Sequence, residues 1–235
     1  MQPMVTKPTA RTPLSKDRVL HAAVALADES GIEAVTMRKL AASLDVEAMS
    51  LYYHVANKDE LLDGMVDMVI GEIEEDCGGF SVGGEAGEWK AGEWKAVLRN
   101  RILTARAAML RHRWTPGVLE TRTTMSPRLV LYFETVLEIL IQGGFSYDLG
   151  HHAMHALGSR ALGFNQELFV PGDDGQEQDN EEMFAALAQL APHLTRMIEA
   201  AAHDAPDLTL GWCDDQTEFE FGIDLILDGL EHRIS

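Results

Sequence analysis

The sequence predicts an all-α protein, in which an N-terminal three-helix domain with a helix-turn-helix is joined to a larger helical domain. Three observations support this fold class. Apolar residues recur at helical spacing through most of the chain, and the alternation typical of strands is absent. In addition, two short helical runs, at about 36–43 and 47–54, are separated only by Leu44-Asp45-Val46, a spacing typical of a helix-turn-helix.

The first helix is expected to begin after Ser15, which can cap it, and to end at Gly31. Thr36 is expected to cap the second helix. Asn57 is expected to cap a fourth helix that runs to about residue 76, with Glu60 at the capping-box position. These signals define a domain at residues 15–76, preceded by a flexible arm at residues 1–14.

The two short runs are expected to pack against each other through apolar residues, namely Leu40, Ala41, Leu44, Val46, Leu51 and Val55. The remaining side chains would face outward and leave the second run free to enter a major groove. The same spacing also fits an ordinary α-helical hairpin inside a bundle, and spacing alone does not decide between the two.

The rest of the chain, residues 77–235, is expected to form the second domain. A glycine-rich joint at 77–88 marks the boundary, and residues 170–180 are too polar to pack and are expected to form an acidic loop. Helices are expected at about 93–112, 116–123, 127–142, 146–169, 181–203 and 215–233.

The last of these helices has a wide apolar face. Phe219, Ile223, Ile226, Leu230 and Ile234 form one stripe, and Phe221, Leu225 and Leu227 broaden it beyond what one neighbouring helix covers. Gly222 and Gly229 would permit a close helix approach. The face therefore predicts either contact with a second copy of the chain or a terminal helix that covers its own core.

Composition restricts the class of protein. The chain has 235 residues, 46% hydrophobic and 24% charged, as in an ordinary soluble protein. No apolar run approaches the roughly 18 residues of a membrane span, so a cytoplasmic protein without membrane contact is expected. Cys77 and Cys213 lie far apart and are expected to be reduced thiols, although a disulfide stays open.

The net charge of −19 argues against a nucleic-acid partner until its distribution is considered. Residues 1–60 contain 7 basic and 8 acidic side chains, so their net charge is −1, whereas the remainder contains 12 and 30. The acidic excess therefore lies after residue 60, on the part of the chain that need not touch DNA. A nearly neutral DNA-reading segment predicts modest non-specific affinity for DNA and reliance on specific contacts.

Catalytic and metal-binding patterns are weak. His151, His152 and His155 form the one cluster with metal-like spacing, but no cysteine or paired carboxylate lies near it in the sequence to complete a site. Packing histidines are the better interpretation, and no metal or cofactor is expected. The chain contains no Gly-x-Ser-x-Gly, no His-Glu-x-x-His and no nucleophile–base pair, so it is not expected to be an enzyme.

Residues from about 15 to 68 resemble the DNA-binding domain of the tetracycline-repressor (TetR) family. The matching features are Gly31-Ile32, Thr36-x-Arg38-Lys39-Leu40-Ala41, Leu51-Tyr52-x-His54-Val55 and Asn57-Lys58-x-x-Leu61-Leu62. A weaker resemblance to the tetracycline-repressor branch follows in Gln142-Gly-Gly-Phe-Ser146, Leu162-Gly163 with Glu167, and Phe221-Gly-Ile-Asp-Leu-Ile-Leu-Asp-Gly-Leu-Glu231. Asp45 departs from the glycine usual in the turn, but aspartate tolerates left-handed backbone.

The resemblance implies a ligand-responsive regulator, probable repressor, that binds a palindromic double-stranded DNA operator as a homodimer and is released by a small-molecule inducer. A ligand-binding scaffold without DNA function and a helical enzyme are the alternatives. The implied DNA contacts are Thr36, Arg38, Lys39, Ala48, Met49, Ser50, Tyr52, Tyr53, His54 and Lys58. Arg38 would read a base, and Lys58 would meet a phosphate at the start of the fourth helix, unless it is simply solvated.

The resemblance also implies a ligand cavity and a four-helix dimer interface. The cavity would be lined by His112, Trp114, Leu119, Arg122, Met125, Phe133, His155, Phe164 and Glu167. The interface would contain Ala153, Leu157, Phe219, Gly222, Ile223, Ile226 and Leu230. Thr121-Arg122 aligns with a Thr-Arg pair of the tetracycline-binding members, but Val118 replaces their metal-binding histidine. Valine offers no lone pair, so the inducer is not expected to be a magnesium–tetracycline complex.

Overall fold

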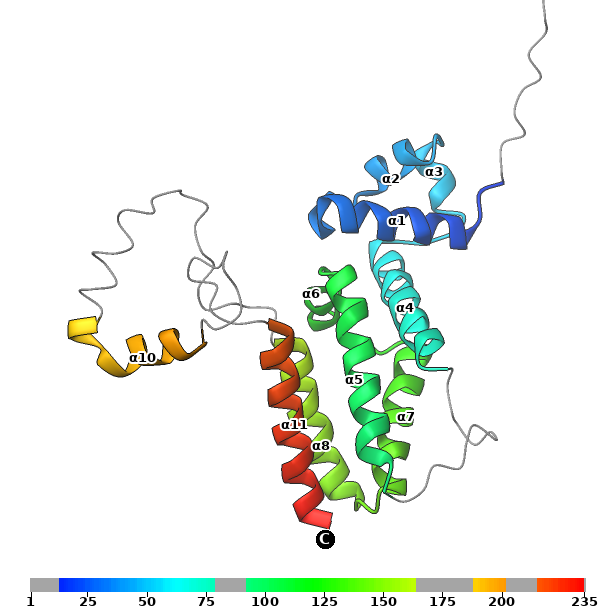
Figure 1. The fold of residues 1–235 in the computed structure, drawn as a ribbon. Coiled ribbons are helices and arrows are strands. Elements are labelled where there is room, and N and C mark those ends of the chain that lie inside the picture. Colours follow the sequence, from blue (N-terminus) through cyan, green and yellow to red (C-terminus); the bar gives the residue numbers. More distant parts are fainter. Residues whose placement is uncertain (1–12, 79–91, 164–187, 202–214, 235) are drawn as a thin grey trace, which may run out of the picture. The chain divides into compact units, whose positions relative to one another are not determined.

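The computed structural model describes residues 13–78, 92–163, 188–201 and 215–234, and Figure 1 shows their helices in sequence colours. The described residues form α-helices and one short 3-10 turn, with no strand among them, which confirms the all-α prediction. The chain divides into two compact units, residues 1–146 and 147–235. The helices of the first unit are α1 (Lys16–Ser30), η1 (Ile32–Ala34), α2 (Met37–Ser43), α3 (Ala48–Leu51), α4 (Lys58–Asp76), α5 (Trp94–Arg111), α6 (Thr115–Glu120) and α7 (Pro127–Gln142).

The three expected caps of the N-terminal helices are confirmed. The Arg18 backbone N–H donates to the Ser15 hydroxyl oxygen over 3.2 Å, and the Lys39 N–H donates to Thr36 Oγ1 over the same distance. The Glu60 N–H donates to Asn57 Oδ1 over 2.8 Å. Each bond satisfies one of the donors that a helix start leaves unpaired, and therefore fixes where α1, α2 and α4 begin.

The turn between α2 and α3 has the conformation expected from Asp45. This residue has φ 54°, the left-handed region that aspartate tolerates better than most residues. The Val46 N–H returns to the Ala41 carbonyl over 3.0 Å and closes the turn. Leu40 and Leu51 are fully buried between the helices. However, α3 is shorter than the expected 47–54, because regular helix ends at Leu51 and a turn continues to His54.

Helix α4 joins the head, which we define as α1–α3, to the helices behind it. It packs against α1 and also against α5, α6 and α7, and α1 lies across its N-terminal end (Figure 1). A Cβ on Gly64 would lie 2.6 Å from Leu20 Cδ2, so glycine permits the close approach of α1. The opposite side of α4 buries Met65, Val69 and Ile73. Residues on both sides of the expected joint at 77–88 thus share one core. Most of that joint, residues 79–88, lies outside the described residues.

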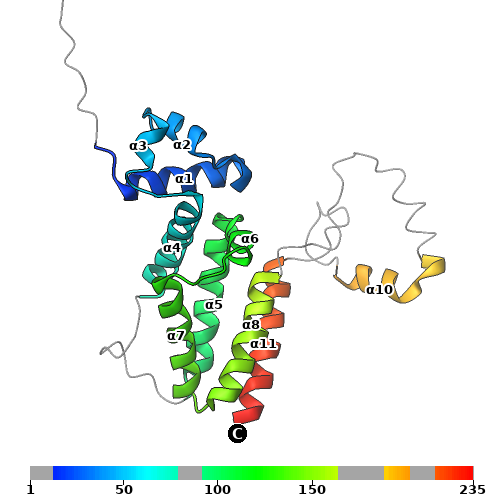
Figure 2. The ribbon, with the colours of Figure 1, turned by 180° about the vertical axis from the view of Figure 1, so that it is seen from behind.

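The second unit contains α8 (Tyr147–Gly163), α10 (Pro192–Ala201) and α11 (Asp215–Ile234). Helices α8 and α11 pack side by side in opposite directions, as Figures 1 and 2 both show. The expected acidic loop at 170–180 lies outside the described residues, as do Phe164, Glu167 and Cys213. No helix in the described ranges combines the length and apolar character that a membrane span requires.

Candidate nucleic-acid interface and the polar network behind it

The tip of the head exposes large side chains that a folded protein ordinarily covers. Tyr53 is 88% exposed, Met49 71% and Tyr52 44%, and all three lie on α3 or in the turn that follows it. Aromatic and apolar groups gathered at one tip indicate a surface that meets a partner. Ala48, Ser50 and His54 are half-buried beside them.

Three exposed cations surround this tip: Arg38 and Lys39 on α2, and Lys58 at the start of α4. Within the part of the chain that the structure describes, none of the three forms an ion pair. Lys16 differs, because its Nζ lies 2.6 Å from Glu60 Oε1. Glu60 also accepts from the Ala56 N–H, and its pKa is lowered chiefly by the hydrogen bond from Lys16. Arg38, Lys39 and Lys58 therefore differ from Lys16, whose charge is matched by a carboxylate.

Thr36 has a second role beside its expected contact with DNA. Its hydroxyl oxygen accepts from the Lys39 N–H, so the same residue that starts α2 lies exposed at the edge of the tip. The hydroxyl proton is a separate donor that the cap does not use.

Behind the head, α4 presents a row of carboxylates to the segment between α6 and α7. Arg122 Nη2 lies 3.0 Å from Asp59 Oδ1, and its Nη1 lies 3.1 Å from Asp63 Oδ1. One turn further along, Asp67 accepts from the Ser126 hydroxyl. The pKa of Arg122 is raised, because the two aspartates outweigh the opposing effect of desolvation. This row holds α4 to the helices behind it.

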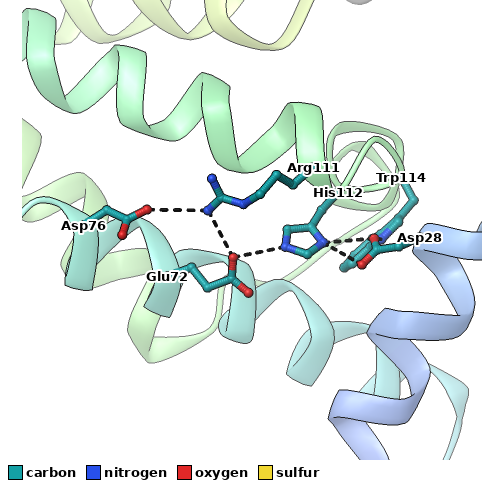
Figure 3. A network of polar contacts seen from close by, with 6 residues as sticks. All are labelled: Asp28, Glu72, Asp76, Arg111, His112 and Trp114. Atoms are coloured by element: carbon teal, nitrogen blue, oxygen red, sulfur yellow. Dashed lines mark hydrogen bonds and ion pairs between the residues drawn. The ribbon is translucent and has the colours of Figure 1, made fainter.

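A second polar network joins α1, α4, α5 and α6 (Figure 3). His112, directly after α5, places Nδ1 2.9 Å from Asp28 Oδ1 in α1 and Nε2 3.1 Å from Glu72 Oε2 in α4. Trp114 Nε1 donates to the same Asp28 oxygen over 2.7 Å. Arg111 approaches Glu72 at 3.2 Å and Asp76 at 3.5 Å.

Three residues expected at a ligand cavity therefore have other partners in the structure. His112 and Trp114 contact Asp28 of the head, and Arg122 contacts α4. The His112 ring, the Trp114 N–H and the two Arg122 Nη groups are thus engaged in fixing the head and α4, whereas Arg122 Nε has no hydrogen-bond partner among the described residues. Any ligand that recruits them must compete with Asp28, Glu72, Asp59 or Asp63.

A buried ion pair that the sequence analysis did not identify lies among α4, α5 and α7. Arg101 Nη2 contacts Glu74 Oε1, with the two side chains 6% and 4% exposed. Within the described ranges, Glu74 Oε2 and Arg101 Nε have no hydrogen-bond partner. The Tyr132 ring lies 5.0 Å from the Arg101 guanidinium carbon, and burial raises the pKa of Tyr132 to about 12. Buried polar atoms without partners are uncommon and call for an explanation.

The other expected ligand residues are dispersed. Met125 is 62% exposed and Phe133 38%, Leu119 is half-buried and His155 is exposed on α8. The rings of His151 and His155 lie 4.6 Å apart, yet no group of three potential metal ligands occurs among the described residues. Cys77 is a free, half-buried cysteine, and burial raises its pKa.

Most of the expected dimer residues are buried inside one copy of the second unit. Ala153, Phe219 and Ile223 have no exposed surface, while Leu157 is 4% and Leu230 7% exposed. Gly222 lies under Arg160, because a Cβ there would be 2.7 Å from Arg160 Nε. The outward apolar residues of α11 are instead Phe221, 61% exposed, and Leu225, 56% exposed, with Ile226 half-buried. A copy of the chain that docks on α11 would therefore meet Phe221 and Leu225 first.

Comparisons with known proteins agree with this architecture. The family model described as "Tetracyclin repressor-like, C-terminal domain" matches residues 86–234, and that of "Bacterial regulatory proteins, tetR family" matches residues 19–65. An HTH-type transcriptional regulator of Saccharopolyspora erythraea is 33% identical over 133 residues, 56% of this chain and 51% of the relative. The class D tetracycline repressor protein of Escherichia coli is 33% identical over 150 residues, 64% of each chain. This chain thus spans about half of the first relative and under two thirds of the second.

A solved structure matches over nearly the whole chain. ActR from Streptomyces coelicolor, in complex with actinorhodin, has a TM-score of 0.70 at 26% identity, and the match covers 95% of this chain and 100% of that one. The C-terminal family model covers more than half of the chain, and the N-terminal model covers the helix-turn-helix. The chain therefore belongs to the tetracycline-repressor (TetR) family of DNA-binding transcriptional regulators.

Proposed function

We propose that the protein is a transcriptional repressor that binds a palindromic operator as a homodimer and leaves it when a small molecule binds. The observation that supports DNA contact most directly is the tip of the head, where unpaired cations surround exposed Met49, Tyr52 and Tyr53. Cations neutralise phosphates, and α3 with the turn after it would meet base edges in the major groove. We place the protein in the cytoplasm, where operator DNA is accessible.

A selected operator tests this proposal. Random duplexes enriched on the full-length protein should converge on a palindromic sequence, and binding should weaken as salt is raised. Enriched duplexes that share no sequence, or a DNA affinity that does not change with salt concentration, would contradict the proposed role of the head in operator binding.

Arg38→Ala should cost about 1–3 kcal/mol of operator binding and relax the preference at one base position. The arginine fork suits the O6 and N7 atoms of guanine, whereas Lys58 is positioned for a phosphate. Lys58→Ala is therefore the matched comparison and should weaken all sequences alike while flattening the salt dependence. Both are measured by fluorescence anisotropy on the selected duplex and on single-base variants. An Arg38→Ala protein with unchanged affinity and preference would contradict the base-reading role.

We propose that the inducer binds in the interior of the helical body near Glu74 and Arg101. The support is chemical: Glu74 Oε2 can accept a hydrogen bond and Arg101 Nε can donate one, and neither atom has a partner among the residues that the structure describes. Around them lie Tyr132 and the apolar surfaces of α4, α5 and α7, a combination typical of small-molecule sites. ActR, which shares this fold, was solved with actinorhodin bound, and this supports ligand binding by the C-terminal domain.

The inducer is proposed to act without a metal ion. Val118 stands where the tetracycline-binding members have a metal-binding histidine. Its side chain is 4% exposed within α6 and has no atom that ligates a cation. Titration of the operator complex with tetracycline should therefore release no DNA, with or without magnesium. Release by an apolar compound in the presence of EDTA would support the proposal, whereas magnesium-dependent release by tetracycline would overturn it.

A further inference from the structure

The His112 ring is buried between two carboxylates that belong to different helices. Asp28 of α1 lies 2.9 and 3.0 Å from Nδ1 through its two oxygens, and Glu72 of α4 lies 3.1 Å from Nε2. His112 is 7% exposed, whereas the side chains of Asp28 and Glu72 are 29% and 38% exposed. The ring thus connects the head to the C-terminal part of α4 (Figure 3).

The chemistry of imidazole limits which form can make both contacts. Neutral imidazole carries one N–H, so its second nitrogen would direct a lone pair at a carboxylate oxygen. Imidazolium donates from both nitrogens, and each bond is then strengthened by charge. We infer that the imidazolium form of His112 clamps Asp28 to Glu72, and that loss of its proton frees the head from this two-sided contact.

The two carboxylates that contact the His112 ring differ in their other partners. Arg111 of α5 contacts Glu72 and Asp76 of α4, so Glu72 keeps a cation when His112 is neutral. Burial alone would raise the pKa of Glu72, but hydrogen bonds from His112 and Arg111 outweigh it and lower that pKa, which keeps Glu72 a carboxylate. Asp28 has, among the described residues, only the neutral Trp114 N–H as a further hydrogen-bond donor.

The position of His112 makes this contact a point of regulation. It lies between α5 and α6, and Trp114, at the start of α6, donates to the same aspartate. A shift of α6 would move both donors away from Asp28 together. Loss of the imidazolium proton would weaken the same contact from the other direction. The consequence for operator binding rests on the proposed function, but the clamp itself does not.

Hydrogen exchange on the free protein tests the clamp without DNA. After correction for the intrinsic pH dependence of exchange, amides near Asp28 in the last turn of α1 should lose about fivefold protection between pH 6 and pH 8.5. His112→Gln, a neutral side chain, should show the low protection at both pH values. His21→Gln is the matched control, because His21 is an exposed histidine of α1 whose ring, as far as the structure describes the chain, contacts Asp17 of its own helix. This variant should behave as wild type.

A second variant keeps the test decisive if His112→Gln unfolds. Asp28→Asn removes the charge but retains an acceptor for Trp114, so its protection should be independent of pH. Equal pH dependence in wild type and Asp28→Asn would overturn the clamp. Selection of an operator at both pH values separates the two proposals: if no duplex is enriched while the exchange result holds, the repressor proposal fails and the clamp stands.

Discussion

Replacing Glu74 by alanine is expected to lower the free energy of unfolding by about 3–5 kcal/mol, because Arg101 then keeps a buried charge with no counter-ion. Arg101 is 5% exposed, so its guanidinium is largely shielded from bulk water. Tyr132 cannot supply the missing charge either, since burial raises its pKa to about 12 and the phenol stays neutral at ordinary pH. Chemical denaturation followed by circular dichroism measures the loss.

Two controls separate a buried pair from a surface pair. The double substitution Glu74→Leu with Arg101→Met removes both charges, and most of the lost stability should return because no charge is left unpaired. Lys16→Ala breaks an exposed ion pair and should leave the unfolding midpoint nearly unchanged. A Glu74→Ala protein as stable as wild type would indicate that water reaches Arg101, and the ligand site proposed there would lose its main support.

Replacing Phe221 and Leu225 together by glutamate is expected to separate the proposed dimer. The two side chains lie four residues apart on one side of α11 and are 61% and 56% exposed in a single chain. Charges there would have to be buried when two copies meet, which is strongly unfavourable. Light scattering should give the mass of one chain, 25.9 kDa, and operator affinity should fall by about 100-fold or more as two linked heads become one.

Phe221 and Leu225 are suitable positions for this test because both side chains are exposed in a single chain. Leu230, part of the apolar stripe seen in the sequence, is 7% exposed inside its own chain, so a charge there would unfold the α8–α11 pair instead of testing an interface. Val130→Glu on α7, at a site 47% exposed, is the matched control for an added surface charge and should leave the mass unchanged. A Phe221→Glu, Leu225→Glu protein that keeps twice the chain mass would place the interface elsewhere.

Sequence reasoning located the helix starts because each depends on residues three positions apart. Ser15, Thr36 and Asn57 each accept from the backbone of the third following residue, and the chain itself displays that spacing. The C-terminal end of α3 was not predicted. The turn after Leu51 exposes Tyr52 and Tyr53, so no packing extends the helix beyond it.

The partners of His112 and Arg122 could not be predicted from residues near them in the sequence. His112 meets Asp28 across 84 positions, and Arg122 meets Asp59 across 63, so spacing along the chain cannot reveal either pair. One signal was available: Asp59, Asp63 and Asp67 recur every four residues on α4. Like charges at that spacing destabilise a helix unless other groups face them. The row therefore indicated an opposing set of donors, which the structure identifies as Arg122 and Ser126.

The unpaired cations of the tip also set how the proposed repressor would search a genome. Residues 1–60 have a net charge of −1 and the rest of the chain −18, so attraction to phosphate is concentrated in the N-terminal part, where Arg38, Lys39 and Lys58 are exposed, while the acidic remainder is repelled. Non-cognate DNA competes for a regulator through this charge term alone. A head with few free cations spends little time on such DNA. Few copies would then be sequestered along the chromosome, and a small pool of the protein would keep its operator occupied.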